Sequence, residues 1–139
     1  MKAVLDTNVV VSGLLTPGGN CGQIVDMAIE GSFELFVDGR ILSEYEEVLQ
    51  RPELKLPAAD TEELLRFIRS VAVQVVPAPL VRKLPDLSDI SFLEVAACAD
   101  AVLITGNKRH FPSRACHGVT VLSPKELLEW LASEGRGQR

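Results

Sequence analysis

Acidic, hydroxyl and amide side chains follow the apolar segments of this sequence that are suited to form strands. They are Asp6, Thr7 and Asn8 after residues 3–5, Asp38 after residues 33–37, and Thr105, Gly106, Asn107 and Lys108 after residues 101–104. Asp86 and Asp89 precede the helix that leads into the last of these segments. In an open α/β sheet, ligands bind beyond the carboxyl ends of the strands. The sequence therefore predicts that several carboxylates face one rim of a sheet.

A group of carboxylates at one rim has a definite chemistry. Like charges a few ångströms apart raise one another's pKa, so the group needs a counter-ion to remain ionised. Oxygen ligands suit a hard cation such as Mg²⁺ or Mn²⁺. Such ions bind the attacking and leaving oxygens of a phosphodiester and activate water. The pattern is thus typical of metal-assisted phosphodiester hydrolysis.

The elements that must position these residues alternate along the chain between strands and helices. The predicted strands cover residues 3–5, 33–37, 73–76, 101–105 and 119–122, and the predicted helices cover residues 20–31, 41–51, 60–71, 89–99 and 124 to about 132. Such alternation predicts an α/β protein in which helices cover both faces of a parallel sheet. Residues 1–134 are predicted to form a single domain and residues 135–139 a frayed tail.

Composition supports one folded domain and limits its partners. The chain has 139 residues, 47% of them hydrophobic and only 5% aromatic, which excludes disorder and predicts an aliphatic core. A net charge of −5 disfavours binding to nucleic acid through overall charge. Cys21, Cys98 and Cys116 form no C-x-x-C pair and are expected to be buried thiols in a reducing cytosol. The apolar run at residues 9–15 is too short to span a membrane, so a cytoplasmic protein with no membrane partner is expected.

Several acidic residues also have a structural interpretation. Asp6, Asp38 and Asp89 each stand where an aspartate can cap a helix, and Ser91 with Glu94 has the spacing of a capping box. Asp38 is better explained as a cap than as a ligand. A turn before the helix explains Asp86 as well as a ligand role does.

Two further ambiguities cannot be resolved from residue patterns. In the helix of residues 41–51, Glu44 and Glu46 flank the apolar face at similar angles, so periodicity does not select between them. The glycine-rich residues 18–22 invite comparison with a phosphate-binding loop. They lack a preceding strand and a Gly-Lys-Ser/Thr ending, which favours a loop that simply begins a helix.

Four short motifs occur in the order seen in one known family. They are Asp6-Thr7-Asn8, Ser43-Glu44-Tyr45, Asp86-x-x-Asp89-x-x-Phe92-Leu93-Glu94, and Ile104-Thr105-Gly106-Asn107-x-x-His110-Phe111. In this order the chain resembles the PIN-domain family over residues 2–132, most closely the VapC-like toxins of bacterial and archaeal toxin–antitoxin pairs. The resemblance implies a three-layer α/β/α fold with a twisted, mostly parallel sheet of four or five strands.

The resemblance also implies a function and a site. Family members of this kind are Mg²⁺- or Mn²⁺-dependent ribonucleases that form homodimers and are inhibited by a small antitoxin protein. By motif position, Asp6, Glu44 and Asp89 would be the metal-binding acids, and Asn8 and Thr105 the polar residues that orient them. The match thus favours Glu44 over Glu46.

The fourth position of the motif departs from the family pattern. Many members have an aspartate where this chain has Asn107, which keeps an oxygen ligand but loses a negative charge. Asp100 cannot replace it, because it precedes the strand of residues 101–104 and lies at the opposite edge. The site is therefore expected to contain three acids and the Asn107 amide, with weakened metal binding.

Two other functions remain open, and the basic residues bear on the choice. Asn107 raises the alternative of a PIN-fold RNA-binding module with weakened catalysis. An aspartyl-phosphate enzyme, such as a haloacid-dehalogenase-like phosphatase or a receiver domain, also has an Asp after an early strand, but the rest of either pattern is missing. Lys108, Arg109 and Arg114 form a local basic segment that is a candidate for RNA phosphate contacts. With a net negative chain, RNA binding is expected to depend on bound metal.

Overall fold

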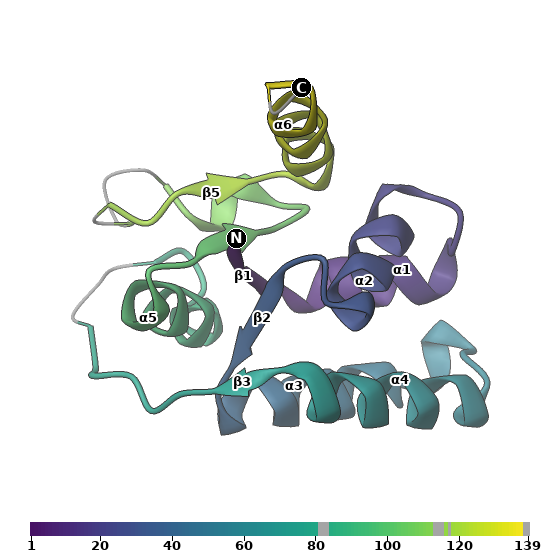
Figure 1. Ribbon diagram of the computed structural model, residues 1–139. Coiled ribbons are helices and arrows are strands. Elements are labelled where there is room, and N and C mark those ends of the chain that lie inside the picture. Colours follow the sequence, from purple (N-terminus) through teal and green to yellow (C-terminus); the bar gives the residue numbers. More distant parts are fainter. Residues whose placement is uncertain (81–83, 113–115, 117, 138–139) are drawn as a thin grey trace.

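A parallel sheet of five strands, in the order β3-β2-β1-β4-β5, runs through the middle of the molecule (Figure 1). In this computed structural model, residues 1–80, 84–112, 116 and 118–137 are described. The strands are β1 (Lys2–Leu5), β2 (Glu34–Val37), β3 (Val73–Gln74), β4 (Val102–Ile104) and β5 (Val121–Leu122), and all neighbours pair in parallel. The predicted parallel sheet is confirmed.

Helices cover both sides of the sheet, so the three-layer prediction is also confirmed. They are α1 (Thr7–Leu15), α2 (Asn20–Glu30), α3 (Gly39–Leu49), α4 (Ala58–Val71), α5 (Ile90–Ala99) and α6 (Pro124–Gly137), with short 3₁₀ turns η1 (Pro52–Leu54), η2 (Leu87–Asp89) and η3 (Lys108–His110). Helix α5 packs against β1, β2 and β4, while the α1–α2 pair lies on the other side of β1 in Figure 1. Within the described residues, no helix combines the length and the apolar character needed to span a bilayer.

The central strand explains why the chain folds around its N-terminal segment. Ala3, Val4 and Leu5 are all fully or almost fully buried, without the alternation of a strand that has one wet face. Only a parallel sheet with both faces covered buries such a run. Each of these side chains therefore contributes apolar burial to the core.

Strand order places the carboxyl end of β1 at the switch point of the sheet. The chain leaves β1 and forms β2 on one side, and it later returns to form β4 on the other. Leu5 pairs with Ile104 across β1 and β4, and the Asp6 N–H donates to the Ile104 carbonyl at 2.9 Å. The residues that follow these strands, Asp6 and Thr105, are thus adjacent, as the sequence predicted. Ligands of open α/β sheets bind at such a point.

Helix α1 has no counterpart among the predicted helices, and the other differences lie mainly at the sheet edges and at the end of α6. Strands β3 and β5 have two residues each, where four were predicted, because edge strands have one partner to pair with. Helix α6 extends to Gly137, beyond the predicted end near Ala132, and residues 138–139 of the predicted tail lie outside the described residues. The predicted domain extent of residues 1–134 stays a prediction. Cys98 is exposed, so the expectation that all three cysteines are buried is wrong.

The glycine-rich loop begins a helix, as predicted. Helix α2 starts at Asn20. A Cβ atom on Gly22 would lie 2.0 Å from the Pro17 carbonyl oxygen, which is far inside van der Waals contact. Gly22 thus allows close backbone approach of the loop to the helix.

Candidate active site

Asp6 lies at the centre of a polar cluster beyond β1 and β4. Its side chain is buried, and Asp6 Oδ2 accepts a hydrogen bond from the Thr105 hydroxyl at 2.7 Å and a longer one from the Asn8 amide at 3.4 Å. The Asn8 Oδ1 atom in turn accepts the Gly106 N–H at 3.0 Å. Asp6 makes no well-aligned side-chain capping hydrogen bond with α1, although the Thr7 and Asn8 N–H groups lie close enough to lower its pKa. Asn8 and Thr105 therefore both donate to the Asp6 carboxylate, and their supporting role in a metal site stays a prediction.

Glu44 reaches the same cluster from α3. Its Oε2 atom accepts a hydrogen bond from the Thr7 hydroxyl, which links α3 to the start of α1. The next residue, Tyr45, is fully buried and donates from its hydroxyl to the Leu5 carbonyl. By contrast, Glu46 is exposed and pairs with Arg69 on α4 at 2.9 Å. Glu44 thus contacts Thr7, next to Asp6, whereas Glu46 lies towards α4. The choice of Glu44 as a metal-binding acid stays a prediction.

Asp89 approaches from the start of α5. It is buried, and its Oδ2 atom makes no well-aligned hydrogen bond with the described residues, although His110 Nδ1 lies 2.9 Å away. Asp89 does not cap α5. A buried carboxylate oxygen without a hydrogen bond is uncommon and suggests a place for a cation. His110 belongs to the fourth motif, but its contact with Asp89 was not predicted from the sequence.

Electrostatics couples these three acids. Burial raises the pKa of Asp6, of Glu44 and of Asp89, the last to about 6. The negative charge of Asp6 adds to the increase at both Glu44 and Asp89, whereas His110 lowers the pKa of Asp89. Asp6 thus lies within electrostatic range of both Glu44 and Asp89. Among the described side chains, no three His, Cys, Asp or Glu residues converge into a ready-made metal site.

The remaining predicted residues take other positions. The Asn107 N–H donates to the Thr105 hydroxyl at 3.0 Å, but its side-chain amide makes no hydrogen bond within the described part of the chain. Lys108 forms an ion pair with Glu126 at the start of α6, and Arg109 is exposed. Arg114 lies outside the described residues.

Two structural interpretations of acidic residues are confirmed, whereas the helix caps expected at Asp6 and Asp89 and the capping box do not form. Asp38 caps α3 by accepting the Ile41 N–H at 3.0 Å, and Asp86 forms a turn by accepting the Ser88 N–H and hydroxyl. Hydrogen bonds from Ser88 hold the pKa of Asp86 below its usual value. The capping box of Ser91 and Glu94 does not form, because Glu94 instead pairs with Arg40 on α3 at 2.7 Å.

Comparison with known proteins agrees with this fold. A family model described as PIN domain matches residues 2–109. The uncharacterized protein MJ1680 of Methanocaldococcus jannaschii is 31% identical over 141 residues, which cover 93% of this chain and 90% of that protein.

Two solved structures share the fold. One is VapBC2 from Rickettsia felis, bound to a DNA fragment from its promoter. It matches with a TM-score of 0.61 and 13% identity over 88% of this chain and 98% of that chain. VapBC-1 from nontypeable Haemophilus influenzae matches with a TM-score of 0.60 and 13% identity over 90% and 99% of the two chains. At this identity, the likeness concerns the fold alone.

The protein has a parallel α/β/α fold with buried acids at the switch point of its sheet. Such a fold and site suit chemistry on phosphate esters. Within that class, this chain belongs to the PIN domain family.

Proposed function

We propose that this PIN domain is a metal-dependent endoribonuclease that hydrolyses RNA phosphodiester bonds. The observation that supports it best is the group of Asp6, Glu44 and Asp89, three carboxyls from separate elements whose pKa values are all raised at one sheet edge. Keeping such acids buried destabilises the ionised site unless a cation binds there. The burial of these acids therefore costs stability in the metal-free protein, which supports a functional role for them.

The donor set fits Mg²⁺ or Mn²⁺. Asp6, Glu44 and Asp89 would hold the ion through hard carboxylate oxygens, and Asp89 Oδ2 makes no well-aligned hydrogen bond with the described residues that a cation would have to displace. When bound, the metal supplies Lewis-acid stabilisation of the phosphodiester and a more acidic water. The protein's own contribution is orientation. Thr105 and Asn8 hold Asp6, the Thr7 hydroxyl holds Glu44, and His110 lies against Asp89.

The biological setting proposed is a toxin–antitoxin pair in the cytoplasm. The two similar folds come from VapBC structures, one of them bound to promoter DNA. Together with the family resemblance, they support the proposal of a small antitoxin partner and a homodimeric toxin. Arg109 is exposed and directly precedes His110, whose Nδ1 lies 2.9 Å from Asp89 Oδ2. Arg109, with Lys108 and Arg114, remains a candidate for RNA phosphate contacts.

A direct assay tests the proposed activity. The purified chain is incubated with end-labelled RNA and either Mn²⁺, Mg²⁺ or EDTA, and products are resolved on a denaturing gel. Cleavage is expected with each metal and not with EDTA. Cleavage at the same sites in EDTA would show that the metal mechanism is wrong.

Asn107 supports a second candidate, a PIN-fold RNA-binding module with weak or no catalysis. In that case RNA binds in the presence of metal and stays intact. Replacing Asn107 with Asp adds a negative charge near Thr105 and is expected to tighten Mn²⁺ binding several-fold and to raise cleavage. Titration with Mn²⁺ followed by electron paramagnetic resonance measures the affinity. Multiple-turnover cleavage by the wild-type chain argues against this candidate, and unchanged Mn²⁺ affinity in Asn107→Asp removes Asn107 from the site.

A further inference from the structure

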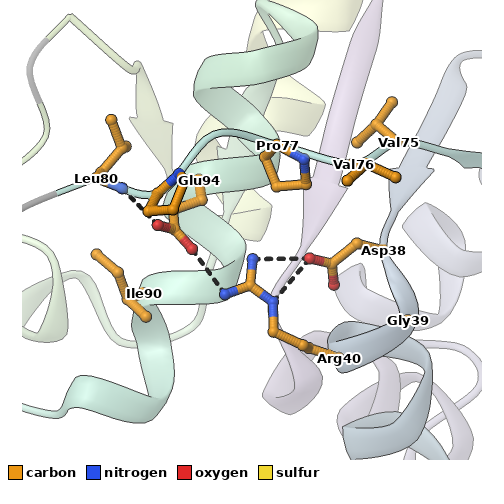
Figure 2. A pocket seen from close by; sticks show the side chains of 10 residues that line it. Asp38, Gly39, Arg40, Val75, Val76, Pro77, Leu80, Ile90 and Glu94 are labelled. Atoms are coloured by element: carbon orange, nitrogen blue, oxygen red, sulfur yellow. Dashed lines mark hydrogen bonds and ion pairs between the residues drawn. The ribbon is translucent and has the colours of Figure 1, made fainter.

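A hollow lined by the segment after β3 already pairs its own charged groups. It has a volume of about 770 cubic ångströms, and Arg40 lies in it, paired with both Asp38 and Glu94 (Figure 2). A smaller hollow of about 210 cubic ångströms lies between the end of α3 and the start of α4, and we call it the α3–α4 pocket. It differs from the first because one of its buried polar groups has no hydrogen-bond partner within the described residues.

Thr61 on α4 lines the α3–α4 pocket and carries this unpaired group. The residue is 3% exposed, and its Oγ1 atom makes no hydrogen bond within the described part of the chain. Its backbone is paired, since the Thr61 N–H donates to the Pro57 carbonyl at 3.1 Å. A buried hydroxyl without a partner lowers the stability of the folded protein. A ligand that accepts a hydrogen bond from Thr61 would remove this cost.

The α3–α4 pocket has one cation available for a ligand. Lys55 and Arg51 both line it, but Arg51 is paired with Glu47 at 2.9 Å, whereas Lys55 is exposed and forms no ion pair within the described residues. Helix α4 begins at Ala58 on the pocket wall, and no side chain caps this helix start, so the positive end of the helix dipole is free. Glu62 also lines the pocket, but it is exposed to water, which weakens its repulsion. This balance suits a ligand with one negative charge better than a phosphate with two.

The other walls and the size of the pocket indicate a short aliphatic ligand. The apolar surface is supplied by Leu49, Pro52, Leu56 and Ala58, and Leu49 is only 1% exposed. An alkyl group in contact with these side chains is removed from water, which favours binding. Pockets for drug-sized ligands have volumes of roughly 300–1,000 cubic ångströms, so this smaller one suits a body of about five carbon atoms.

We propose that the α3–α4 pocket binds a small aliphatic monocarboxylate, of which isocaproate is a representative. One carboxylate oxygen would accept a hydrogen bond from the Thr61 hydroxyl, and the other would pair with Lys55 near the start of α4. The branched alkyl group would pack against Leu49 and Leu56. This site is separate from the proposed nuclease centre, since none of the three acids lines it.

Methyl-resolved NMR on the full chain tests this site. The protein, with labelled Leu, Ala and Thr methyl groups, is titrated at neutral pH and constant ionic strength with isocaproate, isocaproamide, acetate and inorganic phosphate. Isocaproate is expected to shift the methyl signals of Leu49, Leu56 and Thr61. The neutral amide is expected to bind about tenfold more weakly, since hydrogen bonds to charged groups are stronger. Acetate lacks the alkyl group and is expected to bind at least about tenfold more weakly as well.

Variants connect the signal to Thr61 and Lys55. Thr61→Val keeps the shape of the side chain but removes the hydroxyl, so it is expected to weaken isocaproate binding about tenfold and to raise the thermal midpoint of the ligand-free protein. Lys55→Gln removes a charge at an exposed position and is expected to weaken binding several-fold with the midpoint unchanged. Lys125→Gln on α6 is the matched control and should bind isocaproate like the wild type, because Lys125 lies outside the pocket.

Four results would overturn the proposal. They are equal affinity for isocaproate and its amide, shifts of the same signals by phosphate alone, unchanged isocaproate binding by Thr61→Val, and no shift of the pocket methyl signals by isocaproate. A lower midpoint of Thr61→Val together with unchanged binding would assign the hydroxyl a purely structural role. If that variant does not fold, the ligand series and Lys55→Gln still decide the question. RNA cleavage enters none of these results, so the nuclease proposal stands or fails separately.

Discussion

Replacing Asp6 with Asn is expected to lower metal-dependent RNA cleavage at least about 100-fold. Loss of residues that only support metal ligands costs 10- to 100-fold in affinity or activity, and Asp6 is proposed as a ligand itself. The substitution keeps the shape of the side chain, so Thr105 still has an acceptor. Because burial raises the pKa of Asp6, the neutral amide is also expected to raise the thermal midpoint of the metal-free protein. Gel assays and differential scanning calorimetry in EDTA measure the two effects.

Opposite changes in activity and stability separate a functional role from damage to the fold. Asp26→Asn on α2 removes the same charge from an exposed position and serves as the matched control, with cleavage and midpoint unchanged. If Asp6→Asn lowers the thermal midpoint and activity together, Asp6 is mainly structural. Full cleavage by this variant would rule out Asp6 as a ligand.

Sequence patterns predicted the parts of the site that directly follow the ends of strands. Asp6 and Thr105 could be placed together because a parallel sheet brings the ends of its strands to one edge, and the register of β1 and β4 confirms this. Aspartates before helices were harder. Asp38 does cap α3 whereas Asp89 does not cap α5, although both have the same local pattern. The packing of α5 against the sheet decides whether the aspartate caps its helix, and a short stretch of sequence does not contain that information.

Contacts between residues far apart in the sequence could not be predicted from local residue patterns. The spacing of Ser91 and Glu94 indicated a capping box, yet Glu94 pairs with Arg40, which is 54 positions earlier in the chain. At this buried helix start, an ion pair with a buried carboxylate outweighs a local hydrogen bond. The choice of Glu44 over Glu46 depended on the family resemblance, since only the fold brings Thr7 and Glu44 together. His110 stood in a quoted motif, but its proximity to Asp89 follows from the turn at η3.

Replacing Asp89 with Asn is expected to stabilise the metal-free protein above pH 6 and to have no effect below about pH 4. Burial and the charge of Asp6 raise the pKa of Asp89 from 3.8 to about 6. Between these values the unfolded chain releases the Asp89 proton and the folded chain keeps it, so the wild type loses stability as the pH rises. At pH 7.5 the gain in the free energy of unfolding should be about 1 kcal/mol. Solvent screening reduces the roughly 3 kcal/mol that the full pKa change would carry.

Bound metal is expected to reverse the order of stability of the wild type and the Asp89→Asn variant. Mn²⁺ that binds only the folded state stabilises the wild type in proportion to its occupancy, and the Asp89→Asn variant should gain little. Asp86→Asn is the matched control, because hydrogen bonds from Ser88 lower the pKa of Asp86 and its amide variant should show no gain at pH 7.5. Urea unfolding at pH 4 and pH 7.5, with EDTA or Mn²⁺, compares the three proteins. Equal stabilisation of wild type and Asp89→Asn by Mn²⁺ would place the ion away from Asp89 and leave the raised pKa as a consequence of burial alone.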